Sequence, residues 1–273
     1  PVSEDLLLEK LNIFEQKAKH DLPDASFFEI FTAAAFEIFI DSKIDFLVCE
    51  VGLGGCFDST NVVAPLISVL TSVSLEHTEF LGADLYSIAK DKSFISRRNK
   101  SFVVASELQE EALKGVRDTV SQIGACLFLA TNFLGHELED LFSELDTEKY
   151  SFCSYYKKNL RTSLAVLFVL QQESSFKLSK KDLVYGVGKT FWPGRFDVRV
   201  IGDRTVIFDC AHNPEGFQFF YGQFLQSKFS GLKCHLVFAS FCDKDWKKNL
   251  DIIDPLVLSY GMTTIGSARS VDP

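Results

Sequence analysis

Short blocks of consecutive apolar residues recur along the first half of the chain and are separated by segments of helical periodicity. The blocks occupy residues 45–49, 67–73, 102–105 and 126–129. Helical spacing of apolar positions marks residues 85–92 and 108–120. Unbroken apolar blocks are typical of strands buried on both faces of a parallel sheet. The pattern therefore predicts an α/β fold whose parallel sheet is covered by helices on both faces.

Two helices are predicted before the first strand. Ser3 is a good N-cap for a helix that continues to about Lys17. Ser26 caps a second helix that continues to about Ile40, with Glu29 three residues after the cap. Since the second helix is apolar almost all round, we expect it to be buried.

The pattern breaks at residues 190–195 and then restarts. We place a domain boundary there, which gives domains 1–190 and 195–273. Helices are expected at 159–171 and 179–187 before the break. After it we expect a hairpin (196–200 and 205–208), a helix at 215–224 capped by Asn213, a strand at 235–239, a helix at 244–253 capped by Asp243, and a strand at 263–265.

Composition narrows the class of protein. A length of 273 residues suggests about two domains, and the net charge of −9 argues against a nucleic-acid partner. The seven cysteines are scattered without a C-x-x-C pair, which favours reduced thiols over a disulfide frame or a zinc site. No apolar run reaches membrane-spanning length. We expect a cytoplasmic protein.

A glycine-rich turn follows the first apolar block. We call residues 50–61 the glycine turn; it runs Glu-Val-Gly-Leu-Gly-Gly-Cys-Phe-Asp-Ser-Thr-Asn. Glu50 ends one predicted strand and His77 lies just past the next. If those strands are neighbours, a carboxylate and an imidazole emerge at one sheet edge, where they are suited to a magnesium ion. A satisfied core or loop histidine is the commoner alternative.

A second polar cluster comprises Asp209, His212 and Asn213, at a strand end that leads into a helix. The free N–H groups of a helix N-terminus suit a phosphate, and Asp209 suits a ribose hydroxyl. A simple capped turn is an equally good interpretation. Arg195 is a candidate phosphate contact, and an exposed linker arginine is the alternative.

Two apparent phosphate loops are rejected. Residues 186–190 resemble the end of a P-loop, but Leu183 stands where its first glycine belongs. The glycine turn fails the dinucleotide fingerprint because Phe57 occupies the third glycine position.

Seven segments in register resemble the folylpolyglutamate synthase/dihydrofolate synthase family of the Mur ligase superfamily, over nearly the whole chain. They are residues 26–29, the glycine turn, 75–82, 91–95, 192–195, 209–214 and 243–245. The resemblance implies a Mur-ligase-like parallel-sheet ATPase domain followed by a smaller Rossmann-like domain. It implies ATP-dependent addition of L-glutamate to dihydropteroate or a folate through an acyl phosphate, with ATP and Mg²⁺ as cofactors.

The resemblance also implies roles for individual residues. Glu50, His77 and Lys92 match catalytic and magnesium-binding positions, and Lys92 matches a lysine that is carbamylated. Asn159, Arg195 and Asp209 match ATP-binding positions, with His212 close by. The residues that match the pterin pocket are Ser26, Phe27, Phe28, Glu29, Phe57, Asp58 and Ser59. Small-molecule substrates, no nucleic-acid or membrane partner, and a monomer are expected.

Several positions depart from the family pattern. Cys56, Glu76 and Cys210 replace an arginine, an aspartate and a glycine, and Ser93-Phe94 replace Ala-Gly after Lys92. The family's glycine-rich phosphate loop and the far part of its second domain are not found, so we expect this chain by itself not to turn over ATP. Two alternatives stay open: a Mur-type amide ligase that acts on a cell-wall precursor, and a non-catalytic binding module.

Overall fold

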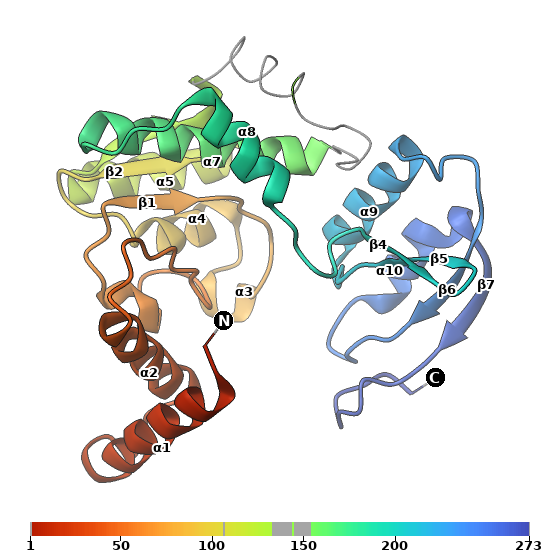
Figure 1. Ribbon diagram of the computed structural model, residues 1–273, viewed down its shortest axis with the longest axis horizontal. Helices are drawn as coiled ribbons and strands as arrows, with labels where there is room; N and C mark the ends of the chain where they lie inside the picture. Colours follow the sequence, from red (N-terminus) through yellow and green to blue (C-terminus); the bar gives the residue numbers. More distant parts are fainter. Residues whose placement is uncertain (1, 106, 133–143, 145–153, 273) are drawn as a thin grey trace. The chain divides into compact units, whose positions relative to one another are not determined.

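The computed structural model describes residues 2–105, 107–132, 144 and 154–272 (Figure 1). The chain divides into two compact units, Pro1–Asn132 and Phe133–Pro273, and each is described by itself. This division falls earlier in the chain than the boundary expected at residues 190–195, which stays a prediction. Both units contain parallel strand pairs and helices, as the sequence predicts.

The first unit begins with two helices and continues as alternating strands and helices. Its elements are α1 (Glu4–Asp21), α2 (Phe27–Asp41), η1 (Ser59–Val62), β1 (Ile67–Leu70), α3 (Thr78–Leu81), α4 (Leu85–Ser93), β2 (Ser101–Val104), α5 (Glu110–Ile123), β3 (Cys126–Leu129) and η2 (Ala130–Asn132). The strands form a parallel sheet in the order β1-β2-β3, which confirms three of the four predicted strands.

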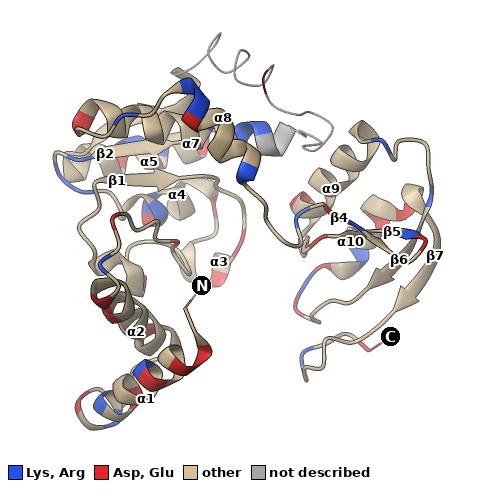
Figure 2. Ribbon diagram, viewed as in Figure 1, with Lys and Arg blue, Asp and Glu red and all other residues tan. Residues whose placement is uncertain are grey.

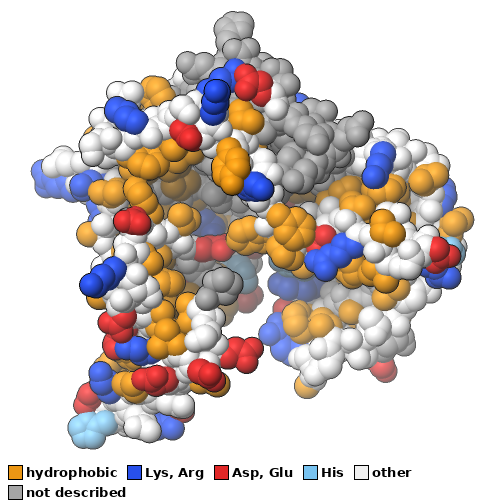
Figure 3. All heavy atoms as spheres, in the orientation of Figure 1, with side chains coloured by type: hydrophobic (Ala, Val, Ile, Leu, Met, Phe, Trp, Pro, Cys, Tyr) orange, Lys and Arg blue, Asp and Glu red, His pale blue; other side chains and the backbone are white. Residues whose placement is uncertain are grey.

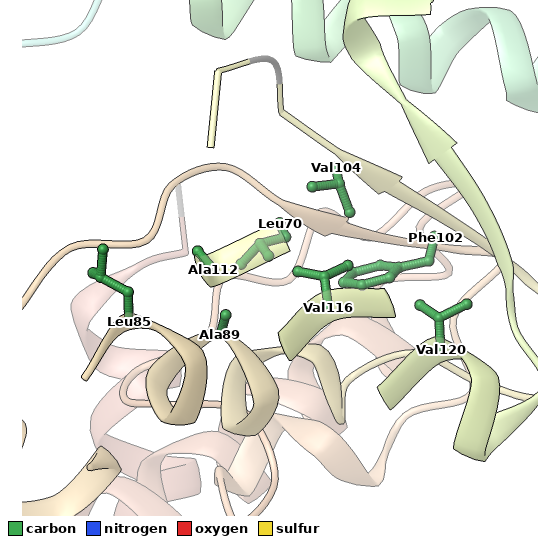
Figure 4. Close-up of a cluster of buried hydrophobic side chains, with 8 residues drawn as sticks. All are labelled: Leu70, Leu85, Ala89, Phe102, Val104, Ala112, Val116 and Val120. Carbon is green, nitrogen blue, oxygen red and sulfur yellow. The ribbon is translucent and has the colours of Figure 1, made fainter. Parts of the chain in front are cut away.

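The core of this unit lies between the sheet and the helices α4 and α5. Phe102 and Val104 of β2 are fully buried and face the two helices (Figure 4). Ala89 of α4 and Val116 of α5 point back at the strands and have no exposed surface. Burial of such side chains stabilises a fold by about 1.5–3 kcal/mol each, so this cluster holds the helices in place.

Local signals set the starts of the N-terminal helices as predicted. The Ser3 hydroxyl accepts a hydrogen bond from the Leu6 N–H, and Ser26 with Glu29 forms a complete capping box. The ammonium group of Lys10 on α1 lies 2.7 Å from Glu37 and 2.8 Å from Asp41 on α2. Figure 2 shows charges of both signs along α1. These ion pairs join α1 to α2.

Two predictions for the first unit are wrong. Residues 46–50 form no strand in the described part of the chain, and Val48 is 97 % exposed. Without a neighbouring strand to supply hydrogen bonds, an apolar run does not enter a sheet. Helix α2 is not buried all round, since Phe27 and Ile40 are 72 % and 75 % exposed. The apolar residues of a helix determine which of its faces can be buried. The neighbouring elements that pack against the helix determine which of those faces are buried.

The second unit has a hairpin and a parallel strand pair. Its described elements are α7 (Ser154–Glu173), α8 (Lys180–Lys189), β4 (Asp197–Ile201), β5 (Arg204–Phe208), α9 (Pro214–Gln226), β6 (Cys234–Phe238), α10 (Trp246–Ile253), η3 (Asp254–Leu256) and β7 (Val257–Met262). The strands β4 and β5 are antiparallel, and β6 and β7 are parallel. Phe196, Phe217, Phe238 and Ile253 belong to its buried core.

Most of the predicted elements of this unit are confirmed, and two details are wrong. The N-cap of α10 is Asp245, whose side chain accepts from the Lys248 N–H, and not Asp243. Asp243 instead lies 2.9 Å from Arg269. The last strand occupies Val257–Met262 and precedes the predicted residues 263–265. Both aspartates suit a cap, so the sequence did not separate them.

Candidate functional site

Asp58 holds the glycine turn together. Its Oδ2 accepts hydrogen bonds from the Gly52 and Leu53 N–H groups at 3.0 and 2.9 Å. Its Oδ1 accepts from the Thr60 N–H at 2.9 Å and caps η1. The carboxylate is thus bonded on both oxygens to its own turn. A contact of Asp58 or Ser59 with a pterin stays a prediction.

The glycines press the turn against the end of α4. A Cβ at Gly55 would lie 2.8 Å from the Lys92 carbonyl oxygen and 2.9 Å from that of Asp91. Gly54 adopts φ +66°, and a Cβ there would lie 2.4 Å from a carboxylate oxygen of Asp91. Neither position has room for a side chain. The turn therefore comes directly against Lys92, which is half-buried.

The end of helix α3 also packs against the glycine turn, at Gly54. A Cβ at Gly54 would also lie 2.7 Å from Leu81 at the end of α3. His77 is the residue before α3, exposed, in the left-handed region at φ 52°. The segments that carry Glu50, His77 and Lys92 therefore converge around Gly54. The predicted strand before Glu50 is missing, so this convergence arises from the turn and not from two neighbouring strands.

The donor types in this region fit a magnesium ion that keeps most of its water ligands. Glu50 is exposed and offers a carboxylate, and His77 offers an imidazole. Lys92 as an ammonium has no lone pair to donate, so it requires conversion to a carbamate to act as a ligand. Within the described ranges, no group of three or more His, Cys, Asp or Glu side chains is arranged to hold a metal. The metal-binding roles of Glu50, His77 and Lys92 stay predictions.

Arg97 ties the glycine turn to the segment after Lys92, a role that no sequence pattern indicates. Its Nη2 donates to Oδ1 of Asn61 at 2.7 Å and to the carbonyls of Asn61 and Val63. Its Nη1 donates to the carbonyl oxygens of residues 94–96 at 3.1–3.2 Å. One guanidinium thus fixes both segments. An Arg-Arg pair after a helix is typical of solvent-exposed charge, and only the folded structure shows that Arg97 is bonded to main-chain carbonyls.

The predicted aromatic segment lies beside the glycine turn. The ring of Phe28 packs against Gly52, where an added Cβ would lie 2.5 Å from it. Phe27 and Phe57 are 72 % and 96 % exposed, and Figure 3 shows hydrophobic side chains on the visible surface of this unit. Glu29 accepts from the Ser26 N–H and hydroxyl, both at 2.7 Å, so this pair caps α2. Roles of Ser26, Phe27, Phe28, Glu29 and Phe57 toward a pterin stay predictions.

In the second unit, two predicted segments come together. The Phe196 N–H donates to Oδ2 of Asp209 at 2.8 Å, and the Cys210 N–H donates to the Gly194 carbonyl at 2.8 Å. These bonds place the turn that contains Arg195 beside the loop of residues 209–213. The positive charge of Arg195 acts on Asp209 and favours its ionised form.

Opposing effects act on the carboxyl group of Asp209. Desolvation raises its pKa, whereas the N–H groups of Phe196 and Ala211 and the charge of Arg195 act in the opposite direction. Desolvation is the largest of these effects, so the pKa of Asp209 lies above its usual range.

The 209–213 loop leads into helix α9 as predicted. The Asn213 side chain accepts from the Gly216 N–H at 2.8 Å and Pro214 is the first helical residue. Nδ1 of His212 lies 3.1 Å from the Cys210 carbonyl and donates to it, because a carbonyl only accepts; in the neutral imidazole this leaves Nε2 as an acceptor. His212 is exposed. His212 directly precedes Asn213, the N-cap of α9.

Asn159 is exposed on α7, and its carbonyl accepts from the Ser163 hydroxyl at 3.0 Å. No hydrogen bond or ion pair among the described residues links Asn159 to the 209–213 loop, so its nucleotide role stays a prediction. The described part of the chain also contains no helix with the length and apolar character needed to cross a membrane.

Comparison with known proteins identifies relatives over most of the chain. The dihydrofolate synthase/folylpolyglutamate synthase of Bacillus subtilis (strain 168) is 32 % identical over 248 residues, which are 84 % of this chain and 56 % of that protein. The chain thus spans about half the length of the curated relatives it matches. No family model matches the sequence.

Solved structures share the fold. Escherichia coli FolC in complex with DHPP and ADP has a TM-score of 0.79 at 25 % identity, and covers 99 % of this chain and 64 % of its own. The bifunctional folylpolyglutamate synthase/dihydrofolate synthase of Yersinia pestis, complexed with AMPPNP and Mn ion, gives 0.76 at 25 % identity with the same coverage. Because relatives of this identity cover most of the chain and the solved structures share its fold, the chain belongs to the folylpolyglutamate synthase/dihydrofolate synthase family and has the Mur-ligase fold.

Proposed function

We propose that the protein joins L-glutamate to the carboxylate of dihydropteroate or of a folate, in a reaction driven by ATP. The names of the relatives support both substrates, and related structures carry DHPP with ADP and AMPPNP with Mn. The same names weigh against a cell-wall precursor as substrate.

The convergence around Gly54 carries the proposal. It gathers the segments of Glu50, His77 and Lys92 at one place and brings the Phe28 ring against Gly52. Glu50 and His77 are the groups that would hold Mg²⁺, together with Lys92 as its carbamate. When bound, the divalent ion offsets the charge of the transferring phosphate. The exposed rings of Phe27 and Phe57 are each suited to stack on a flat pterin ring.

The chemistry that we propose has two steps. A folate carboxylate oxygen attacks the γ-phosphorus of ATP, the bond to the bridging oxygen breaks, and ADP leaves as an acyl phosphate forms. The amine of glutamate then attacks the acyl carbon, loses a proton, and expels inorganic phosphate to give the amide. The protein contributes mainly the positioning of reactants and the stabilisation of charge.

The 209–213 loop is the proposed nucleotide contact of the second unit. Arg195 offers a cation to phosphate, Asp209 accepts from a ribose hydroxyl, and Nε2 of His212 offers a further acceptor. Their association rests on the bonds between residues 194–196 and 209–210. Asn159 is proposed as a further nucleotide contact from the resemblance. A cytoplasmic monomer without nucleic-acid or membrane partners is part of the proposal.

Calorimetry separates the folate assignment from its nearest rival. The protein product of the whole reading frame that contains this sequence is titrated with dihydropteroate and with a UDP-linked sugar, each in the presence of Mg²⁺ and AMPPNP. We expect binding of dihydropteroate and none of the UDP-sugar. Binding of the UDP-sugar alone would assign the protein to cell-wall chemistry. Binding of neither would reject a ligase of either type.

A further inference from the structure

Asn249 on α10 is a fully buried polar side chain, with no exposed surface. It lies one turn before Ile253, which belongs to the apolar core of the second unit, and α10 packs against α9. An asparagine at such a position requires partners for both its amide nitrogen and its carbonyl oxygen.

Only one end of this amide has a partner. Nδ2 of Asn249 donates to the main-chain carbonyl of His212 at 3.3 Å. A carbonyl accepts and never donates, so the nitrogen must face His212 and the amide orientation is fixed. Oδ1 is buried and accepts no hydrogen bond from any described residue.

The unpartnered oxygen makes Asn249 costly for stability. A buried polar atom without a partner costs about 1–3 kcal/mol, whereas an apolar side chain of similar size avoids that cost. One bond of 3.3 Å does not compensate for it. Asn249 therefore contributes by holding the main chain at His212 in place and not by stabilising the fold.

The position of that main chain governs the candidate nucleotide loop. His212 lies between Ala211, whose N–H donates to Asp209, and Asn213, which caps α9. Its ring is held by the Cys210 carbonyl. A shift of the His212 carbonyl moves the ring and the start of α9 together. The bond from Asn249 on α10 joins the bonds from residues 194–196 in holding this loop from outside it, and it is the one that reaches His212.

We propose that Asn249 is a positioning residue that sacrifices fold stability to fix the 209–213 loop for nucleotide binding. That the loop binds a nucleotide rests on the proposed function. That Asn249 holds the loop rests on the geometry alone. A residue retained only for packing would lower stability when replaced by an apolar side chain of similar size.

The test compares Asn249→Met with Ile253→Val, an apolar core change on the same helix that removes no hydrogen bond to the loop. The product of the whole reading frame is used, with AMPPNP affinity from calorimetry, thermal unfolding, and amide hydrogen exchange. For Asn249→Met we expect an unchanged or higher unfolding temperature, about fivefold to tenfold weaker AMPPNP binding, and faster exchange in residues 209–213. For Ile253→Val we expect a lower unfolding temperature with unchanged AMPPNP affinity.

Three results would overturn the inference. One is unchanged exchange of the 209–213 amides in Asn249→Met. Another is a lower unfolding temperature of that variant, which would make Asn249 an ordinary core residue. The third is unchanged AMPPNP affinity. If the unmodified protein does not bind AMPPNP, the proposed function fails, and the exchange measurement still decides whether Asn249 holds the loop.

Discussion

Nη2 of Arg97 donates to Oδ1 of Asn61 at 2.7 Å, and through this bond the end of the glycine turn is joined to the segment that follows Lys92. Asn61 in turn donates from Nδ2 to the Cys56 carbonyl at 3.1 Å. The Asn61 side chain thus links Arg97 to the main chain at Cys56. This arrangement sets the distance between the turn and Lys92.

Arg97→Met is expected to loosen both segments. The change removes one donor from each of five carbonyl oxygens and from the Asn61 side chain, so the free energy of unfolding is expected to fall by about 2–3 kcal/mol in urea titration. Arg98→Met removes the same charge from an adjacent, exposed residue and is the matched control. We expect a change within about 0.5 kcal/mol there. Equal changes in the free energy of unfolding for the two variants would show that the hydrogen bonds of Arg97 do not stabilise the two segments.

Gly55→Ala is expected to push the glycine turn away from Lys92. The new Cβ would come within 2.8–2.9 Å of two carbonyl oxygens of α4, which are main-chain atoms and cannot rotate aside. Such overpacking costs about 1–3 kcal/mol of unfolding free energy. Gly222 lies inside α9 with no atom within 4 Å of an added Cβ. Gly222→Ala is therefore expected to stabilise the protein by up to about 1 kcal/mol. A neutral Gly55→Ala would contradict the close packing.

Because of the capping box of α2, we expect the stability of the protein to depend on pH. The N–H and hydroxyl of Ser26 donate to Glu29 and lower the pKa of its carboxyl group. A lowered pKa means that the stabilisation is complete above the usual glutamate pKa of about 4.3, and is lost as the pH falls through the lower value of the folded protein. The difference in unfolding temperature between the unmodified protein and Glu29→Gln should be largest near pH 7 and shrink toward pH 3.

Glu9→Gln, at an exposed position of α1 outside the capping box, controls for the lost charge in this experiment. A difference for Glu29→Gln that stays constant from pH 7 to pH 3 would show that the carboxylate form of Glu29 contributes nothing to the cap.

Local chemistry was readable from the sequence wherever neighbouring residues decide it. Ser26 and Glu29 lie at capping-box spacing, and Asn213-Pro214 marks the start of α9, and the structure contains both. The strand Cys126–Leu129 was likewise placed correctly. In each case the signal lies within a few residues of the feature it predicts.

Features that depend on distant segments were not readable. The apolar residues 46–49 suggest a buried strand, yet Val48 is exposed because a strand also needs a partner, and the pattern of one segment cannot provide that information. Arg97 and Asn249 act on main-chain carbonyls of residues 36 and 37 positions away. No motif marks such a pairing in a single sequence, so these two residues emerge only from the structure.

The central claim is tested most directly by glutamate ligation. The product of the whole reading frame is incubated with dihydropteroate, radiolabelled L-glutamate and Mg-ATP, and labelled pteroate product and ADP are both counted. We predict one ADP per glutamate joined, and loss of at least about 100-fold in kcat for Glu50→Gln with little change in unfolding temperature, since Glu50 is exposed. Absence of labelled product from the unmodified protein, or full activity of Glu50→Gln, would contradict the account.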